Sequence, residues 1–369
     1  MVDVFKKAVA LVEKDEPCVL ATVVRTKGMT PQKAGAKQLI QSDGSSTGTL
    51  GGGCVEGDIW YYATQMLKKG TGAEFRSYQL NADIAEKDGL ICGGTMHFYI
   101  EPLRRKEPFL SMAKQILQAR ETGPQVAVAT VIAPQGHPFF GNKLLVRKDA
   151  EAAGSLGEKA WDDRAKKLAH ELSLFGGNKT FTTDDGAEIY VEGFTQPPTL
   201  VILGGGHVGK AVYRLALTVG FRVVIIDDRT EFSNAERFPQ AHKTIVSGFE
   251  HPFQDLELGQ NSFVFVATRG HRYDDAATHA AVKTPARYIG LLGSKRKNLL
   301  IFKELLKNGV AEERIKAIHA PVGLNIGAVT PEEIAVSVIA EMIQVVRGGD
   351  GRPLKMDEKE VQQLSLRRS

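Results

Sequence analysis

A six-residue glycine motif, Gly204-Gly205-Gly206-His207-Val208-Gly209, follows an apolar run at residues 199–203 and constrains the fold most tightly. Short continuous apolar runs are typical of buried parallel strands. The motif opens an apolar helical pattern, and a second apolar run at 222–227 ends in Asp227. A strand, a GxGxxG turn, a helix and a strand ending in an acid form the pattern of a Rossmann-type domain. The last half of the chain is therefore predicted to be a parallel sheet covered by helices.

Several residues of this pattern are predicted to bind a nucleotide. Gly204 permits the tight turn, Gly206 lets the backbone approach a diphosphate, and Gly209 lets the helix pack on the strand. His207 begins a helix whose N-terminus favours an anion. Asp227 stands where an acid binds ribose hydroxyls and disfavours a 2′-phosphate, so NAD or another nucleotide is expected rather than NADP. A Rossmann fold without a bound dinucleotide is the alternative.

Further polar clusters follow predicted strands of the same half, at the edge where open parallel sheets bind ligands. The candidates are Arg269 and His271 after the strand at 262–268, Ser294 and Lys295 after 288–292, and His319 after 315–318. Ser294 and Lys295 are predicted to hold an anionic group at a helix start. His271 and His319 are candidates for acid–base catalysis, and loop histidines satisfied by local hydrogen bonds are the alternative.

The first part of the chain contains a repeat. Ala21-Thr22-Val23 matches Ala129-Thr130-Val131, and Gly48-Thr49-Leu50-Gly51 matches Gly154-Ser155-Leu156-Gly157. Gly35 and Lys37 match Gly141 and Lys143 in the same order. These matches predict two related α+β units, about 1–103 and 104–195, within one domain at 1–195. A proline-containing break then leads into the Rossmann-type domain at 199–350, and residues 351–369 form a polar tail.

Glycine and cysteine are concentrated in the first of these two units. Gly51, Gly52 and Gly53 precede Cys54 at a predicted helix start, Glu56 follows in the first turn, and Cys92 lies in another glycine-rich turn. Glycines expose backbone N–H groups to an anion, and a helix start favours a thiolate. Any chemistry of this domain is therefore expected here, with the second unit as scaffold. Small residues packed in tight turns are the alternative, and no His/Cys set has the spacing of a zinc site.

The composition narrows the class of protein. Three cysteines among 369 residues argue against a disulfide framework and for a reducing compartment. No apolar run approaches the roughly 20 residues that cross a bilayer, and the N-terminal segment has no secretory pattern. We therefore expect a cytoplasmic protein with no membrane contact. The net charge is only +4 and its signs are mixed along the chain, so no nucleic-acid partner is expected.

Taken together, the motifs resemble the xanthine dehydrogenase accessory family (XdhC/CoxI). They are Thr47–Glu56, Cys92-Gly93-Gly94, Ile100-Glu101-Pro102, Gly204–Gly209, Ala267–His271, Gly290–Lys295 and Pro321–Gly327. The resemblance covers most of the chain and is weakest across 104–195. One departure is Asn325, where an Asp is the more familiar residue.

The resemblance implies a chaperone for the molybdenum cofactor (molybdopterin). Such a protein binds the cofactor, protects it while a cysteine desulfurase adds a sulfido ligand, and delivers it to a xanthine dehydrogenase-type molybdoenzyme. Cys54 and Cys92 would then ligate molybdenum, transfer sulfur or shield the cofactor. A homodimer is expected as the commonest oligomer.

Two other functions stay open. One is an NAD-dependent oxidoreductase that uses the Rossmann-type domain, with His271 as acid–base group. The other is a nucleotide or redox sensor. Xanthine dehydrogenase activity itself is disfavoured, because three cysteines are too few for that enzyme's iron–sulfur clusters.

Overall fold

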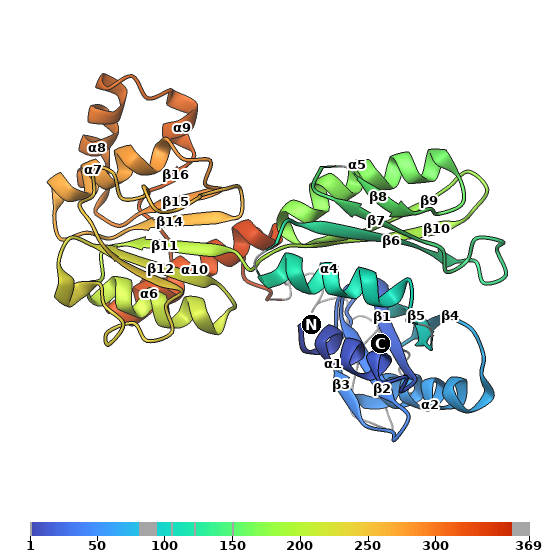
Figure 1. Cartoon of the computed structure of the whole chain (residues 1–369). Coiled ribbons are helices and arrows are strands. Elements are labelled where there is room, and N and C mark those ends of the chain that lie inside the picture. The colour runs from blue at the N-terminus through green and yellow to red at the C-terminus, as the bar shows by residue number, and fades with distance from the viewer. Residues whose placement is uncertain (1, 81–93, 105, 122, 150, 356–369) are drawn as a thin grey trace, which may run out of the picture. The chain divides into compact units, whose positions relative to one another are not determined.

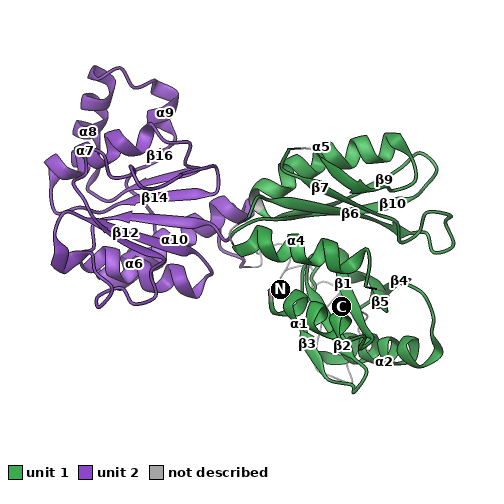
Figure 2. Cartoon of the chain, viewed as in Figure 1, with its two compact units in different colours: residues 1–196 green, residues 197–369 purple. Residues whose placement is uncertain are grey.

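The structure is a computed structural model that describes residues 2–80, 94–104, 106–121, 123–149 and 151–355 (Figure 1). The chain divides into two compact units, residues 1–196 and 197–369, which Figure 2 colours separately. Cys92 lies outside the described residues, as does the end of the predicted polar tail from residue 356.

The first unit contains the same order of elements twice: a helix, three strands, a helix and two strands. The first set is α1 (Val2–Glu13), β1 (Cys18–Lys27), β2 (Lys37–Gln41), β3 (Ser46–Gly48), α2 (Gly53–Lys69), β4 (Glu74–Gln79) and β5 (Thr95–Leu103). The second set is α4 (Phe109–Glu121), β6 (Val126–Ala133), β7 (Lys143–Arg147), β8 (Ala152–Gly154), α5 (Lys159–Phe175), β9 (Asn178–Thr182) and β10 (Glu188–Phe194). The two antiparallel sheets have the matching orders β3-β2-β1-β5-β4 and β8-β7-β6-β10-β9. An internal duplication would produce this shared topology, and we call the two sets the first and second repeat.

Alternating apolar residues place each sheet between two layers. One face of the first sheet packs on α2 through residues such as Ile59 and Phe98, and one face of the second sheet packs on α5 through Trp161. The opposite faces of both sheets share a core with α1 and α4. Cys18 on β1 belongs to this shared core, and burial raises the pKa of its thiol to about 12.

The second unit is an open parallel sheet with the order β13-β12-β11-β14-β15-β16. Its strands are β11 (Thr199–Leu203), β12 (Arg222–Asp227), β13 (Lys243–Val246), β14 (Ser262–Val266), β15 (Tyr288–Leu291) and β16 (Ile318–His319). Its helices are α6 (His207–Thr218), the 3-10 helix η1 (Thr230–Phe232), α7 (His271–Val282), α8 (Lys295–Lys307), α9 (Glu312–Lys316) and α10 (Pro331–Arg347). One apolar core joins the sheet to α6 and α10, and another joins it to α7 and α8.

The predicted fold class, a Rossmann-type parallel sheet after an α+β domain, is therefore confirmed. The sixth strand is shorter than the apolar run at 315–318 indicates. Residues 312–316 form α9, so only Ile318 and His319 pair with β15. The order of the sheet reverses between β11 and β14, and ligands of open α/β sheets bind at the carboxyl edge beside such a reversal.

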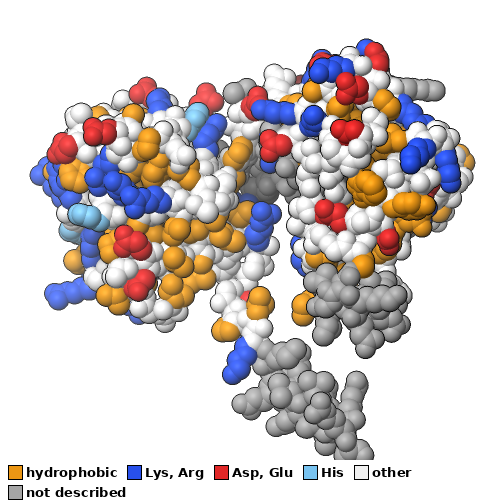
Figure 3. Space-filling view, turned by 90° about the horizontal axis from the view of Figure 1, so that it is seen from below, with side chains coloured by type: hydrophobic (Ala, Val, Ile, Leu, Met, Phe, Trp, Pro, Cys, Tyr) orange, Lys and Arg blue, Asp and Glu red, His pale blue; other side chains and the backbone are white. Residues whose placement is uncertain are grey.

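On the face shown in Figure 3, basic, acidic and apolar side chains are interspersed rather than separated. Among the described residues, no helix has both the length and the apolar character that crossing a bilayer requires.

Candidate functional site

The glycine turn before α2 is held by the carboxylate of Glu56. This carboxylate accepts hydrogen bonds from the Leu50 N–H (2.8 Å), the Gly52 N–H (2.9 Å) and the Thr49 hydroxyl (2.8 Å). The Gln38 amide donates another at 3.1 Å. Burial by itself would raise the pKa of Glu56, but the hydrogen bonds from Gly52, Thr49 and Leu50 outweigh it and lower that pKa. The turn's N–H groups at Leu50 and Gly52 thus bind an anion of the chain itself, whereas the glycine-rich sequence predicts that they face a ligand.

The second repeat contains the same arrangement. There the Asp162 carboxylate accepts hydrogen bonds from the Leu156 N–H (2.8 Å) and the Ser155 hydroxyl (2.9 Å). Asp162 matches Glu56 in the repeat, yet the second repeat has no cysteine at this helix start. An acidic residue at this position therefore stabilises the turn in both repeats, and the presence of Glu56 is explained without a cofactor.

Cys54 is the second residue of α2 and is exposed. A Cβ added to Gly52 would meet no atom within 4 Å, so the space beside this turn is open. An exposed cysteine in an open turn can offer a thiolate to a metal that accepts sulfur ligands, such as molybdenum. The phosphate of a pterin fits less well, because Glu56 already holds the N–H groups of Leu50 and Gly52. Among the described residues, no three His, Cys, Asp or Glu side chains form a metal cluster.

Residues 29–31 contact both the Gly51 turn and Gly94. A Cβ on Gly51 would lie 2.7 Å from Pro31 Cβ, and a Cβ on Gly94 would lie 2.1 Å from the Met29 carbonyl oxygen. The structure therefore brings the Gly51 turn and Gly94 to the same segment. Gly94 follows Cys92 by two residues in the sequence, but Cys92 lies outside the described residues. A joint site of Cys54 and Cys92 stays a prediction.

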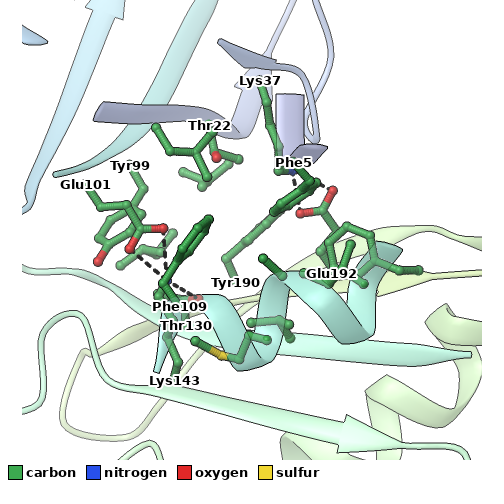
Figure 4. A pocket seen from close by; sticks show the side chains of 18 residues that line it. Phe5, Thr22, Lys37, Tyr99, Glu101, Phe109, Thr130, Lys143, Tyr190 and Glu192 are labelled. Carbon is green, nitrogen blue, oxygen red and sulfur yellow. Dashed lines mark hydrogen bonds and ion pairs between the residues drawn. The ribbon is translucent and has the colours of Figure 1, made fainter. Parts of the chain in front are cut away.

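A cavity of about 60 Å³ lies among the shared faces of the two sheets, where no sequence pattern predicts one (Figure 4). The Lys37 ammonium group lies 2.6 Å from the Glu192 carboxylate, and the Lys143 ammonium group lies 3.1 Å from the Glu101 carboxylate. Each lysine thus pairs with a glutamate of the other repeat. The matching of Lys37 with Lys143 is visible in the sequence, but their reciprocal pairing depends on the tertiary structure.

Tyrosine and threonine side chains complete the polar lining of this cavity. Tyr190 is buried and its hydroxyl has no hydrogen-bond partner in the described part of the chain. Burial, followed by the nearby carboxylate of Glu192, raises the pKa of Tyr190 well above its ordinary value. The space corresponds to about two water molecules. The cavity is too small for a cofactor. We interpret the two ion pairs as contacts that stabilise the packing of one repeat on the other.

The glycine motif of the second unit has the predicted local geometry. Gly204 has a φ of 115°, and a Cβ on Gly209 would lie 2.1 Å from the Gly204 carbonyl oxygen, so α6 packs closely on β11. A Cβ on Gly206 would meet nothing within 4 Å, which leaves the space beside it open. His207 begins α6 and is exposed. Their binding of a nucleotide stays a prediction.

Asp227 and Arg269 reach the same edge from opposite sides of β11. Asp227 ends β12, is 1% exposed and accepts a hydrogen bond from the Gly205 N–H at 2.9 Å. Arg269 follows β14, and its guanidinium lies 2.5 Å from the Asp228 carboxylate. The structure therefore assembles these two predicted residues with the glycine motif at the reversal of the sheet.

The polar residues at the start of α8 have different roles. The Ser294 hydroxyl accepts a hydrogen bond from the Lys297 N–H at 3.3 Å and so caps the helix. Lys295 is exposed. The Lys297 ammonium group contacts the buried carboxylate of Asp274, which also accepts a hydrogen bond from the Thr268 N–H at 3.0 Å. No sequence pattern predicts this role of Asp274.

The two histidine candidates are not brought together, because β15 lies between their strands. His271 begins α7 and is exposed. His319 Nδ1 lies 3.2 Å from the Glu341 carboxylate, and its ring centroid lies 4.4 Å from that of Tyr288. Burial alone would raise the pKa of Glu341, but hydrogen bonds from His319, Tyr288 and the Gly323 N–H outweigh it and lower that pKa. His319 is therefore part of a satisfied polar cluster beside α10.

Three curated proteins are similar to this chain over long stretches. The uncharacterized protein YqeB of Escherichia coli (strain K12) is 32% identical over 241 residues, which are 61% of this chain and 44% of YqeB. A protein of Bacillus subtilis (strain 168) named as a probable xanthine dehydrogenase subunit is 28% identical over 91% of this chain and 95% of its own. The molybdenum cofactor insertion chaperone PaoD of Escherichia coli (strain K12) is 23% identical over 93% of this chain and 87% of its own. The chain thus spans less than half of YqeB and most of the other two.

A solved structure and two family models agree with these relationships. The crystal structure of a Bacillus halodurans protein described as a xanthine dehydrogenase has a TM-score of 0.72, covers 94% of this chain and 96% of its own, and is 24% identical. At that identity it supports the fold alone. A model described as the XdhC Rossmann domain matches residues 200–342, and one described as the XdhC and CoxI family matches residues 11–79. The chain therefore belongs to the XdhC and CoxI family.

Proposed function

We propose that this chain is an accessory protein of molybdoenzyme maturation that binds the molybdenum cofactor. Its family membership supports the proposal, as does its similarity along most of its length to a chaperone that inserts this cofactor. In the finer form of the proposal, the chain protects the cofactor during sulfuration by a cysteine desulfurase. It then delivers the cofactor to a xanthine dehydrogenase-type molybdoenzyme.

The observation that carries the proposal is the exposed thiol of Cys54 in an open glycine turn. Bound cofactor would supply molybdenum, a metal that accepts thiolate sulfur among its ligands. Cys54 would hold the metal, and Cys92 is the second proposed ligand. Glu56 would keep the turn in the conformation that presents Cys54. A homodimer is proposed as the working assembly.

The test is the molybdenum and pterin content of the full chain, purified reduced and anaerobic from a host that makes the cofactor. We expect bound molybdenum in the native chain and its loss in Cys54→Ala and Cys92→Ala. Cys18→Ala is the matched control, because it removes a thiol that is buried in the core. Native chain without molybdenum or pterin would refute cofactor binding. Equal content in Cys54→Ala and Cys18→Ala would refute the role of Cys54.

We further propose that the second unit binds a nucleotide at the carboxyl edge of its sheet. The open space beside Gly206 and the exposed start of the sheet-packed helix α6 support this proposal. Titration of the full chain with nucleotides tests it. Absence of binding at millimolar concentration would refute it.

A further inference from the structure

The carboxylate of Asp227 has no acceptor position left for a ribose hydroxyl. One oxygen accepts hydrogen bonds from the Gly205 N–H (2.9 Å) and from Arg229 Nη2 (3.1 Å). The other oxygen accepts from the Arg229 N–H (3.1 Å) and from Arg229 Nε (2.9 Å). A carboxylate offers about four lone-pair positions, and all are used here. Asp227 is therefore a positioning residue that fixes the guanidinium of Arg229.

The neighbouring acid, Asp228, is also neutralised. Its carboxylate lies 2.5 Å from the Arg269 guanidinium and 3.8 Å from Arg229 Nε. The Arg269 guanidinium also donates to the Tyr273 hydroxyl at 2.6 Å and stacks on that ring. Both acids after β12 are thus paired with arginine. The sequence predicts that an acid at this strand end repels a 2′-phosphate. In the folded chain, the positive charges of Arg229 and Arg269 offset the negative charges of both acids.

A third arginine, Arg237, forms no ion pair with a carboxylate in the described part of the chain. Arg237 Nε donates to the Gly205 carbonyl oxygen at 3.0 Å, which anchors the side chain to the glycine motif. Its two terminal nitrogens have no hydrogen-bond partner among the residues that the structure describes. Arg229 and Arg237 both lie against the ring of Phe232, with guanidinium carbons 3.6 Å and 5.0 Å from its centroid. Both guanidinium groups thus contact the same aromatic ring.

From this arrangement we infer that the second unit binds a nucleotide with an additional phosphate on its ribose, of the NADP type rather than the NAD type. The inference rests on the nucleotide binding proposed above. In a Rossmann-type domain the end of the second strand faces the 2′ and 3′ positions of the ribose. A hydroxyl there finds the acceptors of Asp227 occupied, whereas a phosphate finds guanidinium donors on Arg237 and Arg229.

The experiment compares two probes that differ only in the 2′-phosphate, 5′-AMP and 2′,5′-ADP, by calorimetric titration of the full chain. We expect 2′,5′-ADP to bind at least about tenfold more tightly, the effect of one charge-assisted contact. Arg237→Gln should remove most of that preference. Arg214→Gln, which changes an exposed arginine of α6, should leave it intact.

A second variant gives the opposite signature. Arg229→Gln removes two of the donors to Asp227 and frees acceptor positions for a ribose hydroxyl, so it should shift the preference toward 5′-AMP. Equal binding of the two probes to the native chain, or tighter binding of 5′-AMP, would overturn the inference and leave nucleotide binding standing. Failure of both probes and of NAD and NADP to bind would overturn both proposals. Preference retained in Arg237→Gln would also overturn the assignment.

Discussion

The Lys37 ammonium group contacts the Glu192 carboxylate at 2.6 Å, although 155 residues separate them in the chain. The side chains are only 4% and 8% exposed, so both charges are removed from water. Lys143 and Glu101 repeat the contact with the repeats exchanged. Each lysine also donates a hydrogen bond within its own repeat, Lys37 to the Gly35 carbonyl oxygen and Lys143 to the Thr130 hydroxyl, but its carboxylate partner comes from the other repeat. The ion pairs therefore join the two repeats.

Lys37→Met should lower the free energy of unfolding by about 3–5 kcal/mol, because it leaves the Glu192 charge buried without its partner. Urea unfolding followed by circular dichroism measures the loss. The double change Lys37→Met with Glu192→Leu should recover much of it, since an apolar pair can replace a buried ion pair. Lys159→Met, in the exposed pair with Asp163, is the control and should leave the free energy of unfolding nearly unchanged. Equal effects in Lys37→Met and Lys159→Met would contradict this role of the buried pair.

Glu56→Gln should destabilise the chain by about 1–2 kcal/mol at neutral pH, because the turn loses a charged acceptor of several hydrogen bonds. The folded-state pKa of Glu56 is lowered. Its contribution is therefore complete above the ordinary glutamate pKa of about 4.3 and is lost as pH falls through the lowered value. Unfolding curves of both chains between pH 7 and pH 3 should converge at the acid end. A difference that persists unchanged at pH 3 would show that the charge of Glu56 is not responsible.

Much of the fold could be predicted from local patterns. The apolar run, the glycine motif and Asp227 identify the Rossmann-type sheet, because strand, turn and helix each depend on neighbouring residues. The matching of Lys37 with Lys143 indicates the repeat. The contacts of the candidate site could not be predicted in this way. Some of them join residues that are far apart in the sequence, and in others a side chain of the protein occupies the place expected for a ligand.

Two examples show what the sequence could not supply. In the sequence, Asp227 is an acid at a strand end. The hydrogen bonds by which Arg229 occupies its carboxylate depend on how the chain turns after β12. Glu56 belongs to a family motif, but its hydrogen bonds to the turn before it depend on the backbone conformation there. In both cases the residue type and its spacing suit a ligand, while the structure shows an internal partner.

Two glycines of the motif at residues 204–209 should respond differently to one added methyl group. A Cβ on Gly205 would lie 1.8 Å from the Phe232 carbonyl oxygen, so Gly205→Ala should cost about 3 kcal/mol. A Cβ on Gly206 would meet no atom, and Gly206→Ala should change stability by less than about 0.5 kcal/mol. If a nucleotide diphosphate approaches there, Gly206→Ala should weaken its binding nonetheless. Thermal unfolding and nucleotide titration separate the two effects, and unchanged affinity in Gly206→Ala would place the diphosphate elsewhere.

The lysines at the start of α8 should also differ. Lys297→Met removes the cation beside the buried Asp274 carboxylate and should cost about 3–5 kcal/mol. Lys295 is exposed, and Lys295→Met should change the free energy of unfolding by less than about 0.5 kcal/mol. Chemical denaturation of the two variants makes the comparison. An unchanged free energy of unfolding in Lys297→Met would mean that the hydrogen bonds from Thr268 are enough to satisfy Asp274.

The two histidines proposed as acid–base groups can be separated by stability and function. His319→Ala removes a hydrogen-bond partner of the Glu341 carboxylate and a ring packed on Tyr288, so it should cost about 1–3 kcal/mol. His271→Ala alters an exposed residue and should cost less than about 0.5 kcal/mol. Thermal denaturation supplies the first measurement, and nucleotide affinity of each folded variant supplies the second. We expect His319→Ala to lose stability but keep its affinity, since its partners Tyr288 and Glu341 belong to β15 and α10 and not to the glycine motif. If His319→Ala were fully stable but no longer bound nucleotide, His319 would belong to the binding site.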